Sequence, residues 1–140
     1  MLTRALKRLL SLRYRIQVTG LETITDRAGI LIIPNHPAEI DPAIVSIYLW
    51  DQLKPHPVVL ETMYNLPILN PLMKKIRAIP MPDMEFDSGP YKRKRIGRAL
   101  HDIVTRLQHG ENVLIYPSGR LSVTGEERLG AASGVSAILR

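Results

Sequence analysis

The chain has 140 residues, enough for one domain, and folded chains of this length bury roughly 70% of their surface without metal or disulfide cross-links. It contains no cysteine, which excludes a disulfide framework, thiolate zinc sites and a thiol nucleophile, and suits a reducing compartment. The excess of 19 Lys and Arg over 13 Asp and Glu gives a formal charge of +6, so the surface should attract phosphate groups. With 5 Tyr, 1 Phe and 1 Trp the chain is poor in aromatic platforms for stacking bases, and we expect no nucleic-acid partner.

Residues 2–13 ("LTRALKRLLSLR") predict a basic amphipathic helix. Its apolar residues recur at helical spacing, while Arg4, Lys7, Arg8 and Arg13 lie mostly around the other side. One interpretation is a terminal helix packed on the domain; the other is a helix lying on an anionic membrane surface with its leucines in the acyl region. The cations are spread along the segment rather than gathered before an apolar block, so we expect part of the mature protein and not a secretory signal.

Short apolar runs alternate with helix-like segments along the rest of the chain. Strand patterns occupy residues 14–20, 28–35, 56–62, 77–82 and 112–117. Helical patterns occupy residues 42–53, 70–76 and 89–110. This alternation predicts an α/β fold with a central, mostly parallel sheet flanked by helices, and the β-branched run at 28–35 is typical of a strand covered on both faces. No apolar run approaches the ~20 residues that a transmembrane helix requires.

The last of these helices carries the clearest signals. We expect Asp87 or Ser88 to cap it, Pro90 to occupy its first turn and Gly110 to end it in the left-handed conformation. Its predicted apolar stripe comprises Ile96, Leu100, Ile103, Val104 and Leu107. The basic run at 91–95 is interpreted as a solvated face, with duplex binding as the alternative.

Residues 134–140 ("GVSAILR") predict a further strand that begins without the turn or cap needed to complete it. We therefore expect the domain to be truncated at its C-terminal end. The predicted organisation is a basic amphipathic helix at residues 1–13 followed by one domain at residues 14–140.

Residues 33–45 ("IPNHPAEIDPAIV") place a histidine and an aspartate between two prolines, directly after an apolar run. Within one helix, five positions would separate His36 and Asp41 by about 140°, too far to cooperate. Pro37 and Pro42 favour a strand–loop–helix junction instead, with Asp41 as N-cap and Pro42 as the first helical residue. In such a loop the carboxylate can meet one imidazole nitrogen, leaving the other as a base for a substrate hydroxyl. The alternative is structural: an N-cap aspartate beside a surface histidine.

A second polar loop lies within residues 114–125 ("LIYPSGRLSVTG"), again directly after an apolar strand. Backbone amides around Gly119, with the Arg120 guanidinium beside them, suit a phosphate-binding seat. Ser118 lies outside the Gly-x-Ser-x-Gly elbow that exposes nucleophilic serines, so we do not assign it as a nucleophile. The alternative interpretation is a strand and turn followed by a hairpin.

The order of these motifs resembles the glycerolipid acyltransferase family, to which lysophosphatidate and glycerol-phosphate acyltransferases belong. The first family motif, N-H-x-x-x-x-D-P, matches at Asn35, His36, Asp41 and Pro42. The third, [FY]-P-x-G-x-x-S, matches at Tyr116, Pro117, Gly119 and Ser122. Residues 68–81 are similar to the family's middle segment, and the likeness covers residues 14–140.

The resemblance implies an enzyme of phospholipid biosynthesis that moves a fatty acyl group from a thioester of coenzyme A or acyl carrier protein to the hydroxyl of a lysophospholipid or glycerol phosphate. It implies no metal or other cofactor, with His36 as general base and Asp41 orienting it. The residues implied in substrate binding are Asn35, Tyr116, Pro117, Ser118, Gly119, Arg120 and Ser122. The implied location is the cytoplasmic face of a membrane, as a peripheral or monotopic protein.

Departures from the family pattern concern the acceptor. Where the common third motif reads F-P-E-G-T-R-S, this chain has Ser118, Arg120 and Leu121 in place of the glutamate, threonine and arginine. This shifted arginine resembles the variant found in acyltransferase domains fused to acyl-carrier-protein ligases, so a fused or downstream ligase domain is an expected partner. The middle motif's closing arginine is also replaced, by Pro82 and Asp83.

A second hypothesis rests on the altered third motif and on the family's fourth motif, which would lie beyond residue 140. Under it the chain is a catalytically inactive peripheral membrane or lipid-binding module with the same fold. Its binding to anionic vesicles would weaken with salt and be indifferent to His36.

Overall fold

The computed structural model describes residues 2–36, 38–83, 89–117 and 133–139, which form an α/β fold. The strands are β1 (Leu31–Ile32), β2 (His56–Leu60), β3 (Ile79–Met81) and β4 (Val113–Leu114). The helices are α1 (Leu2–Ser11), a 3₁₀ turn (Leu21–Thr23), α2 (Asp41–Leu53), α3 (Glu61–Tyr64), α4 (Asn70–Lys75), α5 (Pro90–Gln108) and α6 (Ser133–Ile138). The strands form one sheet in the order β1-β4-β2-β3, and every pairing is parallel. The predicted fold class is therefore confirmed.

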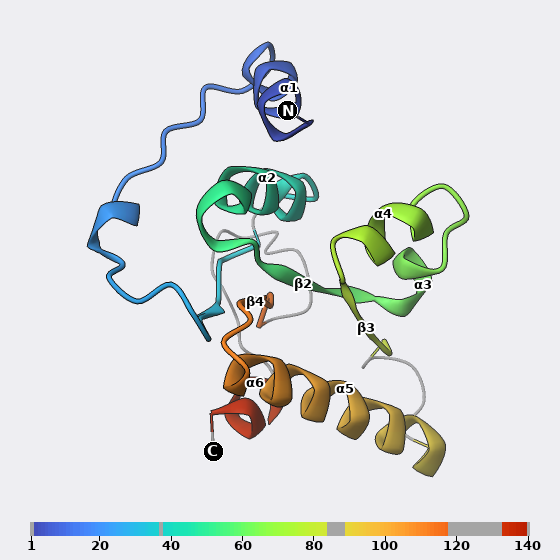
Figure 1. Cartoon of the computed structure of the whole chain (residues 1–140). Coiled ribbons are helices and arrows are strands. Elements are labelled where there is room, and N and C mark those ends of the chain that lie inside the picture. The colour runs from blue at the N-terminus through green and yellow to red at the C-terminus, as the bar shows by residue number, and fades with distance from the viewer. Residues whose placement is uncertain (1, 37, 84–88, 118–132, 140) are drawn as a thin grey trace.

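Each connection between successive strands is a crossover that carries a helix, as parallel pairing requires. α2 connects β1 to β2, the α3–α4 hairpin connects β2 to β3, and α5 connects β3 to β4. In Figure 1, α1 and α2 lie above the strands, α5 and α6 lie below them, and the α3–α4 hairpin stands at the right. Because the strands are parallel, their carboxyl ends share one edge of the sheet.

The core lies between the sheet and α5. Val113 and Leu114 are fully buried because β4 is a central strand, with β1 and β2 on either side. Ile103 of α5 is also fully buried and packs with Val113 and Ile79. Further residues of the predicted α5 stripe that pack on this cluster are Leu100, Val104 and Leu107. By contrast β1 lies at the edge of the sheet and is only half-buried, so the prediction of a strand covered on both faces is wrong.

A buried asparagine ties the start of β4 to two other segments. Asn112 is 5% exposed, and its side-chain amide donates to the carbonyls of Arg27 (2.8 Å) and Leu53 (2.6 Å). Its side-chain oxygen accepts a hydrogen bond from the Ile30 amide (2.9 Å). These bonds satisfy a buried polar group and at the same time fix the entry to β1 and the end of α2.

Two predicted strands are not strands in the structure. Residues 14–20 form an irregular connection at the left of Figure 1, where Ile16 lines a groove with Ile44 of α2 instead of facing a strand partner. Residues 133–138 form α6, whose Ile138 enters the core beside α5. Ile16 and Ile138 thus lie against helices, α2 and α5, while Val18 stays 43% exposed.

The ends of α5 lie close to the predicted positions. Pro90 is its first residue, and Gly110 follows it with φ 79°, the predicted left-handed stop. The N-cap is Gly89 rather than the predicted Asp87 or Ser88, both of which lie outside the described residues.

α1 packs on α2 through part of its basic face. Lys7 forms a 2.7 Å ion pair with Asp51 and lies 5.4 Å from the centre of the Tyr48 ring, while the Thr3 hydroxyl donates to Asp51 at 3.0 Å. These contacts agree with a terminal helix packed on the domain. Leu9 nevertheless stays 63% exposed, so apolar surface also remains. Among the described residues, no helix has both the length and the apolar character needed to cross a bilayer.

Candidate active site

The loops that carry the first and third motifs leave the sheet from neighbouring strands at the same edge. β1 and β4 pair in parallel, with Ile32 beside Leu114. His36 lies four residues beyond Ile32, and Tyr116 lies two residues beyond Leu114. Both side chains therefore emerge past the carboxyl ends of the strands, the edge at which open α/β sheets bind their ligands.

Asp41 closes the loop after β1. Its Oδ2 accepts a 2.6 Å hydrogen bond from the Ala38 amide, and its own amide donates to the Ala38 carbonyl at 3.1 Å. The returning side chain of a capping box makes the same backward bond. Asp41 is the first residue of α2 and Ile40 is the N-cap, so the prediction of Asp41 as N-cap is wrong by one position. Pro42 lies in the first turn, as expected.

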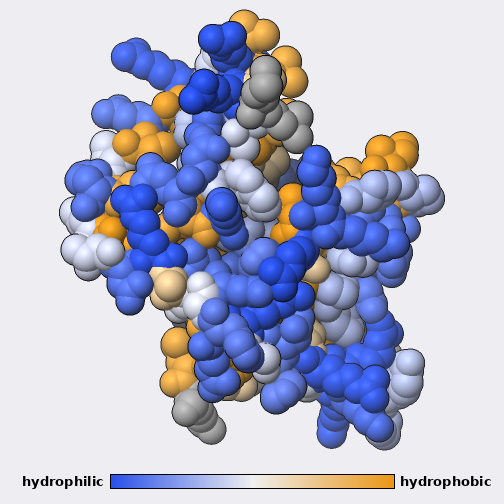
Figure 2. All heavy atoms as spheres, in the orientation of Figure 1, coloured by the Kyte–Doolittle hydropathy of each residue, from blue (hydrophilic) through white to orange (hydrophobic). Residues whose placement is uncertain are grey.

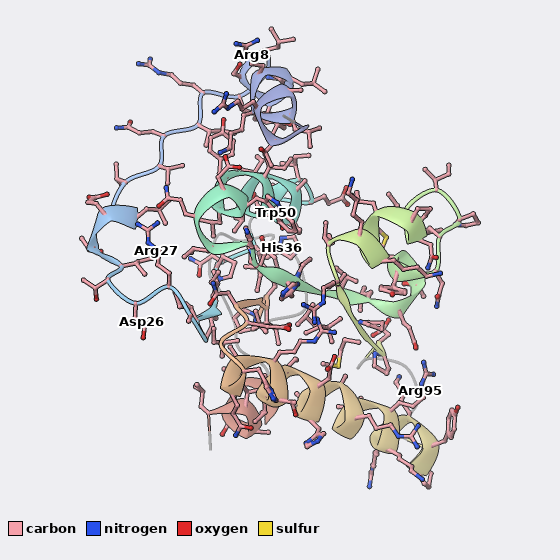
Figure 3. The ribbon with its side chains drawn as sticks, in the orientation of Figure 1. Arg8, Asp26, Arg27, His36, Trp50 and Arg95 are labelled. Carbon is pink, nitrogen blue, oxygen red and sulfur yellow. The ribbon has the colours of Figure 1, made fainter. Side chains whose placement is uncertain are left out.

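The closed loop brings the predicted pair together. The Nδ1 atom of His36 lies 3.6 Å from Oδ2 of Asp41, and the two side chains are 16% and 19% exposed. This distance allows an ion pair but exceeds the 2.7–3.2 Å range of a good hydrogen bond, and catalytic contacts in ligand-free enzymes are often long in this way. In Figure 3 His36 lies near the centre of the molecule below α2, while Arg95 is at the far end of α5.

Tyr116 joins the two motifs in space. Its ring lies 4.4 Å from the His36 ring, centre to centre, with 39° between the planes. The Tyr116 hydroxyl is buried and has no hydrogen-bond partner among the described residues. Burial raises the pKa of this phenol well above its usual value, and the negative charge of Asp41 raises it further. The hydroxyl therefore stays protonated, and it is a donor that a ligand oxygen could satisfy.

The remaining predicted site residues divide into two groups. Asn35 is exposed directly before His36, and Pro117 is half-buried directly after Tyr116. Those that lie outside the described residues are Ser118, Gly119, Arg120 and Ser122. The contact between Tyr116 and His36 was not predicted from the sequence. The available signal was that both residues follow apolar strands by a few positions, so an aromatic ring after one strand can reach a histidine after its neighbour.

A second histidine–carboxylate pair lies at the opposite ends of the strands, where the strands begin. This pair was not predicted from the sequence. His56 begins β2 and Glu111 precedes β4, and His56 Nε2 lies 3.5 Å from Glu111 Oε2. The other His56 nitrogen lies 3.0 Å from the Ile76 carbonyl. Glu111 also pairs with Arg77 at 2.8 Å and with Arg106 at 3.9 Å. This network joins the amino ends of the strands to α5 and to the end of α4, and we interpret its role as stabilising the fold.

The His36–Asp41 pair lies beyond the carboxyl ends of parallel strands, the place where open α/β sheets bind their ligands. The Acyltransferase family model matches residues 15–139, a range that includes both motifs and begins after α1. The chain therefore belongs to the Acyltransferase family and is a transferase of acyl groups. No solved structure matches the chain.

Proposed function

We propose that the chain is a glycerolipid O-acyltransferase. It moves a fatty acyl group from a thioester of coenzyme A or acyl carrier protein to the hydroxyl of a lysophospholipid or glycerol phosphate. The observation that carries the proposal is the 3.6 Å approach of His36 Nδ1 to Asp41 at the carboxyl edge, against the Tyr116 ring. Membership of the Acyltransferase family supports the transfer of an acyl group, and the two motifs support the phosphorylated acceptor.

His36 is the general base in this mechanism. Asp41 at Nδ1 keeps the ring in the tautomer whose Nε2 accepts a proton, and it stabilises the imidazolium that results. The acceptor oxygen attacks the thioester carbonyl carbon while its proton passes to Nε2. The tetrahedral intermediate then expels the thiolate, which takes the proton from the imidazolium and leaves as a thiol. One carbon–oxygen bond forms and one carbon–sulfur bond breaks.

Substrate contacts are proposed on both sides of this base. The protonated Tyr116 hydroxyl donates a hydrogen bond to a substrate oxygen close to the imidazole, with Asn35 and Pro117 bordering the site. The loop that continues through Ser118, Gly119, Arg120 and Ser122 holds the acceptor's phosphate, with the Arg120 guanidinium as its main charge. The segment of residues 1–13, which contains α1, lies outside the acyltransferase domain of residues 14–140, and the protein acts at the cytoplasmic face of a membrane.

The test of the proposal is acceptor-dependent thiol release from acyl-coenzyme A, with lysophosphatidate dispersed in detergent and the full-length protein. His36→Ala is expected to lower kcat by about 10² or more, the contribution of a positioned base. His101→Ala is the matched control, because His101 is an exposed histidine of α5 and should keep full activity. Turnover by His36→Ala at the rate of the control would refute the assigned role.

A further inference from the structure

The hairpin of α3 and α4 carries a cluster of exposed apolar side chains. Met63, Leu66, Ile68 and Leu72 are 47%, 44%, 91% and 46% exposed, and we call these four residues the apolar tip. Figure 2 shows apolar surface at this place, at the upper right of the molecule, and also at the top over α1. Contiguous apolar surface on a single chain marks a contact site for a partner or a membrane.

Hydrogen bonds within the hairpin hold the tip in its outward position. The Leu69 and Asn70 amides both donate to the Leu66 carbonyl, at 2.9 and 2.8 Å. The Asn70 side chain donates to the Tyr64 carbonyl at 2.9 Å. The turn is therefore closed by its own bonds, and Ile68 is presented to solvent by a defined structure.

The unpaired charge on the hairpin is positive, because its one carboxylate, Glu61 at the start of α3, pairs with Arg95 of α5. From Glu61 to the end of α4 the cations are Lys74 and Lys75, and Arg77 follows shortly after. Lys74 and Lys75 are exposed in the last turn of α4, whereas Arg77 is paired with Glu111. An occupant that complements this surface has an apolar region with anionic groups beside it, which is the arrangement at the surface of an anionic bilayer.

The backbone of the tip favours lipid over a protein partner. Pro67 and Pro71 have no amide hydrogen, and the Leu69 and Asn70 amides are already paired inside the hairpin. A protein partner can pair exposed backbone groups, but hydrocarbon cannot, so segments that enter lipid must satisfy these groups internally. The tip thus brings few unpaired amides to the interface.

We propose that the apolar tip inserts into an anionic lipid surface, with Ile68 deepest and Lys74 and Lys75 at the level of the headgroups. α1, whose Leu9 is 63% exposed, adds a second apolar contact at the top of the same view (Figure 1). This surface lies outside the candidate active site. The proposal concerns binding alone and does not rest on the role of His36.

The test is co-sedimentation of the chain with vesicles of phosphatidylcholine alone and of phosphatidylcholine mixed with phosphatidylglycerol. Ile68→Glu places a carboxylate at the insertion depth and is expected to lower the partition coefficient on mixed vesicles by about tenfold or more. Leu139→Glu is the matched control, because Leu139 is 69% exposed but lies near the C-terminus at the opposite end of the molecule (Figure 1). The double change Lys74→Gln, Lys75→Gln is expected to reduce the preference for phosphatidylglycerol and its salt dependence.

Three results would overturn the proposal. The first is equal binding of Ile68→Glu and the unchanged chain to mixed vesicles. The second is dimerisation, seen by light scattering, that Ile68→Glu abolishes while vesicle binding persists, since the tip would then join two copies of the chain. The third is a lowered unfolding temperature for Ile68→Glu, because a side chain that is 91% exposed supports little of the fold.

Activity on a monomeric short-chain acceptor separates this proposal from the acyltransferase proposal. Ile68→Glu should leave that activity unchanged, because no lipid surface is involved. His36→Ala should remove it while keeping vesicle binding. The two measurements therefore show separately whether the lipid-binding proposal or the acyltransferase proposal fails.

Discussion

Substitutions of Asp41 can separate the two roles of its carboxylate. The group accepts a 2.6 Å hydrogen bond from the Ala38 amide, which closes the loop, and it places a negative charge 3.6 Å from His36 Nδ1. Asp41→Asn keeps an oxygen that can accept from Ala38 but removes the charge. Asp41→Ala removes both. Comparing the two variants therefore tests whether the charge matters to catalysis apart from the shape of the loop.

The structure sets the expected magnitudes. A hydrogen bond to a charged acceptor contributes about 1.5–3 kcal/mol, and an anion in the first turn of a helix adds roughly 0.3–1 kcal/mol. Because the Ala38–Asp41 hydrogen bond lies at an exposed position, solvent screening favours the lower values. We expect Asp41→Ala to lower the free energy of unfolding by about 2 kcal/mol and Asp41→Asn by under about 1 kcal/mol. Both variants should lower kcat by about 10² to 10⁴, because each leaves the imidazolium without its counter-charge.

Urea unfolding followed by circular dichroism gives the free energies, and acceptor-dependent thiol release gives the rates. Glu39→Gln is the matched control, since Glu39 is an exposed carboxylate of the same loop and should change neither quantity. An Asp41→Asn variant with kcat within a few-fold of the control would refute the reasoning. Equal destabilisation by Asn and Ala would refute the assignment of the Ala38 bond.

Two further predictions concern buried polar groups. The raised pKa of Tyr116 means that, above the usual tyrosine pKa of about 10, the unfolded chain releases a proton that the folded chain keeps. The free energy of unfolding should therefore fall as the pH rises past about 10, and the fall should be smaller in Tyr116→Phe in matched denaturant titrations; an unchanged slope would contradict it. Asn112→Ala removes one buried and two part-buried hydrogen bonds to the backbone and should lower the free energy of unfolding by about 3 kcal/mol, while the exposed control Asn65→Ala should have no effect. A loss under about 1 kcal/mol for Asn112→Ala would contradict the structural role of that side chain.

The parts of the fold that could be predicted are those with long, regular patterns. α5 has 19 residues and an apolar stripe that only a helix aligns, so its type and its end at Gly110 were predictable. Residues 14–20 and 133–138 are short, and in such runs alternating apolar residues suit a strand and a helix-packed segment equally well. Their structure is decided by what packs on them, α2 for the first and α5 for the second. That information is not local in the sequence.

The candidate site was predictable to the extent that loop geometry determines it. Two prolines around a four-residue gap forced the chain to turn, which brought His36 and Asp41 together. The prediction of Asp41 as N-cap was wrong because its carboxylate accepts a hydrogen bond from the preceding Ala38 amide instead of from an amide of the helix. Which amide it meets depends on the exact conformation of the turn. The contact of Tyr116 with His36 depends on strand order, since it requires β4 beside β1, and the sequence does not state which strands are neighbours. The roles of these residues in catalysis stay predictions.

The choice of His36 over His56 as the proposed base rests on surroundings and not on distance. The two histidine–carboxylate distances, 3.6 and 3.5 Å, are nearly equal. His56 Nδ1 lies 3.0 Å from the Ile76 carbonyl, and its Nε2 faces Glu111 at 3.5 Å. Glu111 also pairs with Arg77 at 2.8 Å and lies 3.9 Å from Arg106. Nδ1 must carry a hydrogen to bond the Ile76 carbonyl, and Nε2 faces a carboxylate of the chain itself, so neither nitrogen is placed toward a substrate. The arginines also weaken the stabilisation that Glu111 could give an imidazolium. His56 also lies at the amino edge of the sheet, whereas His36 lies at the carboxyl edge beside a buried phenol without a partner among the described residues.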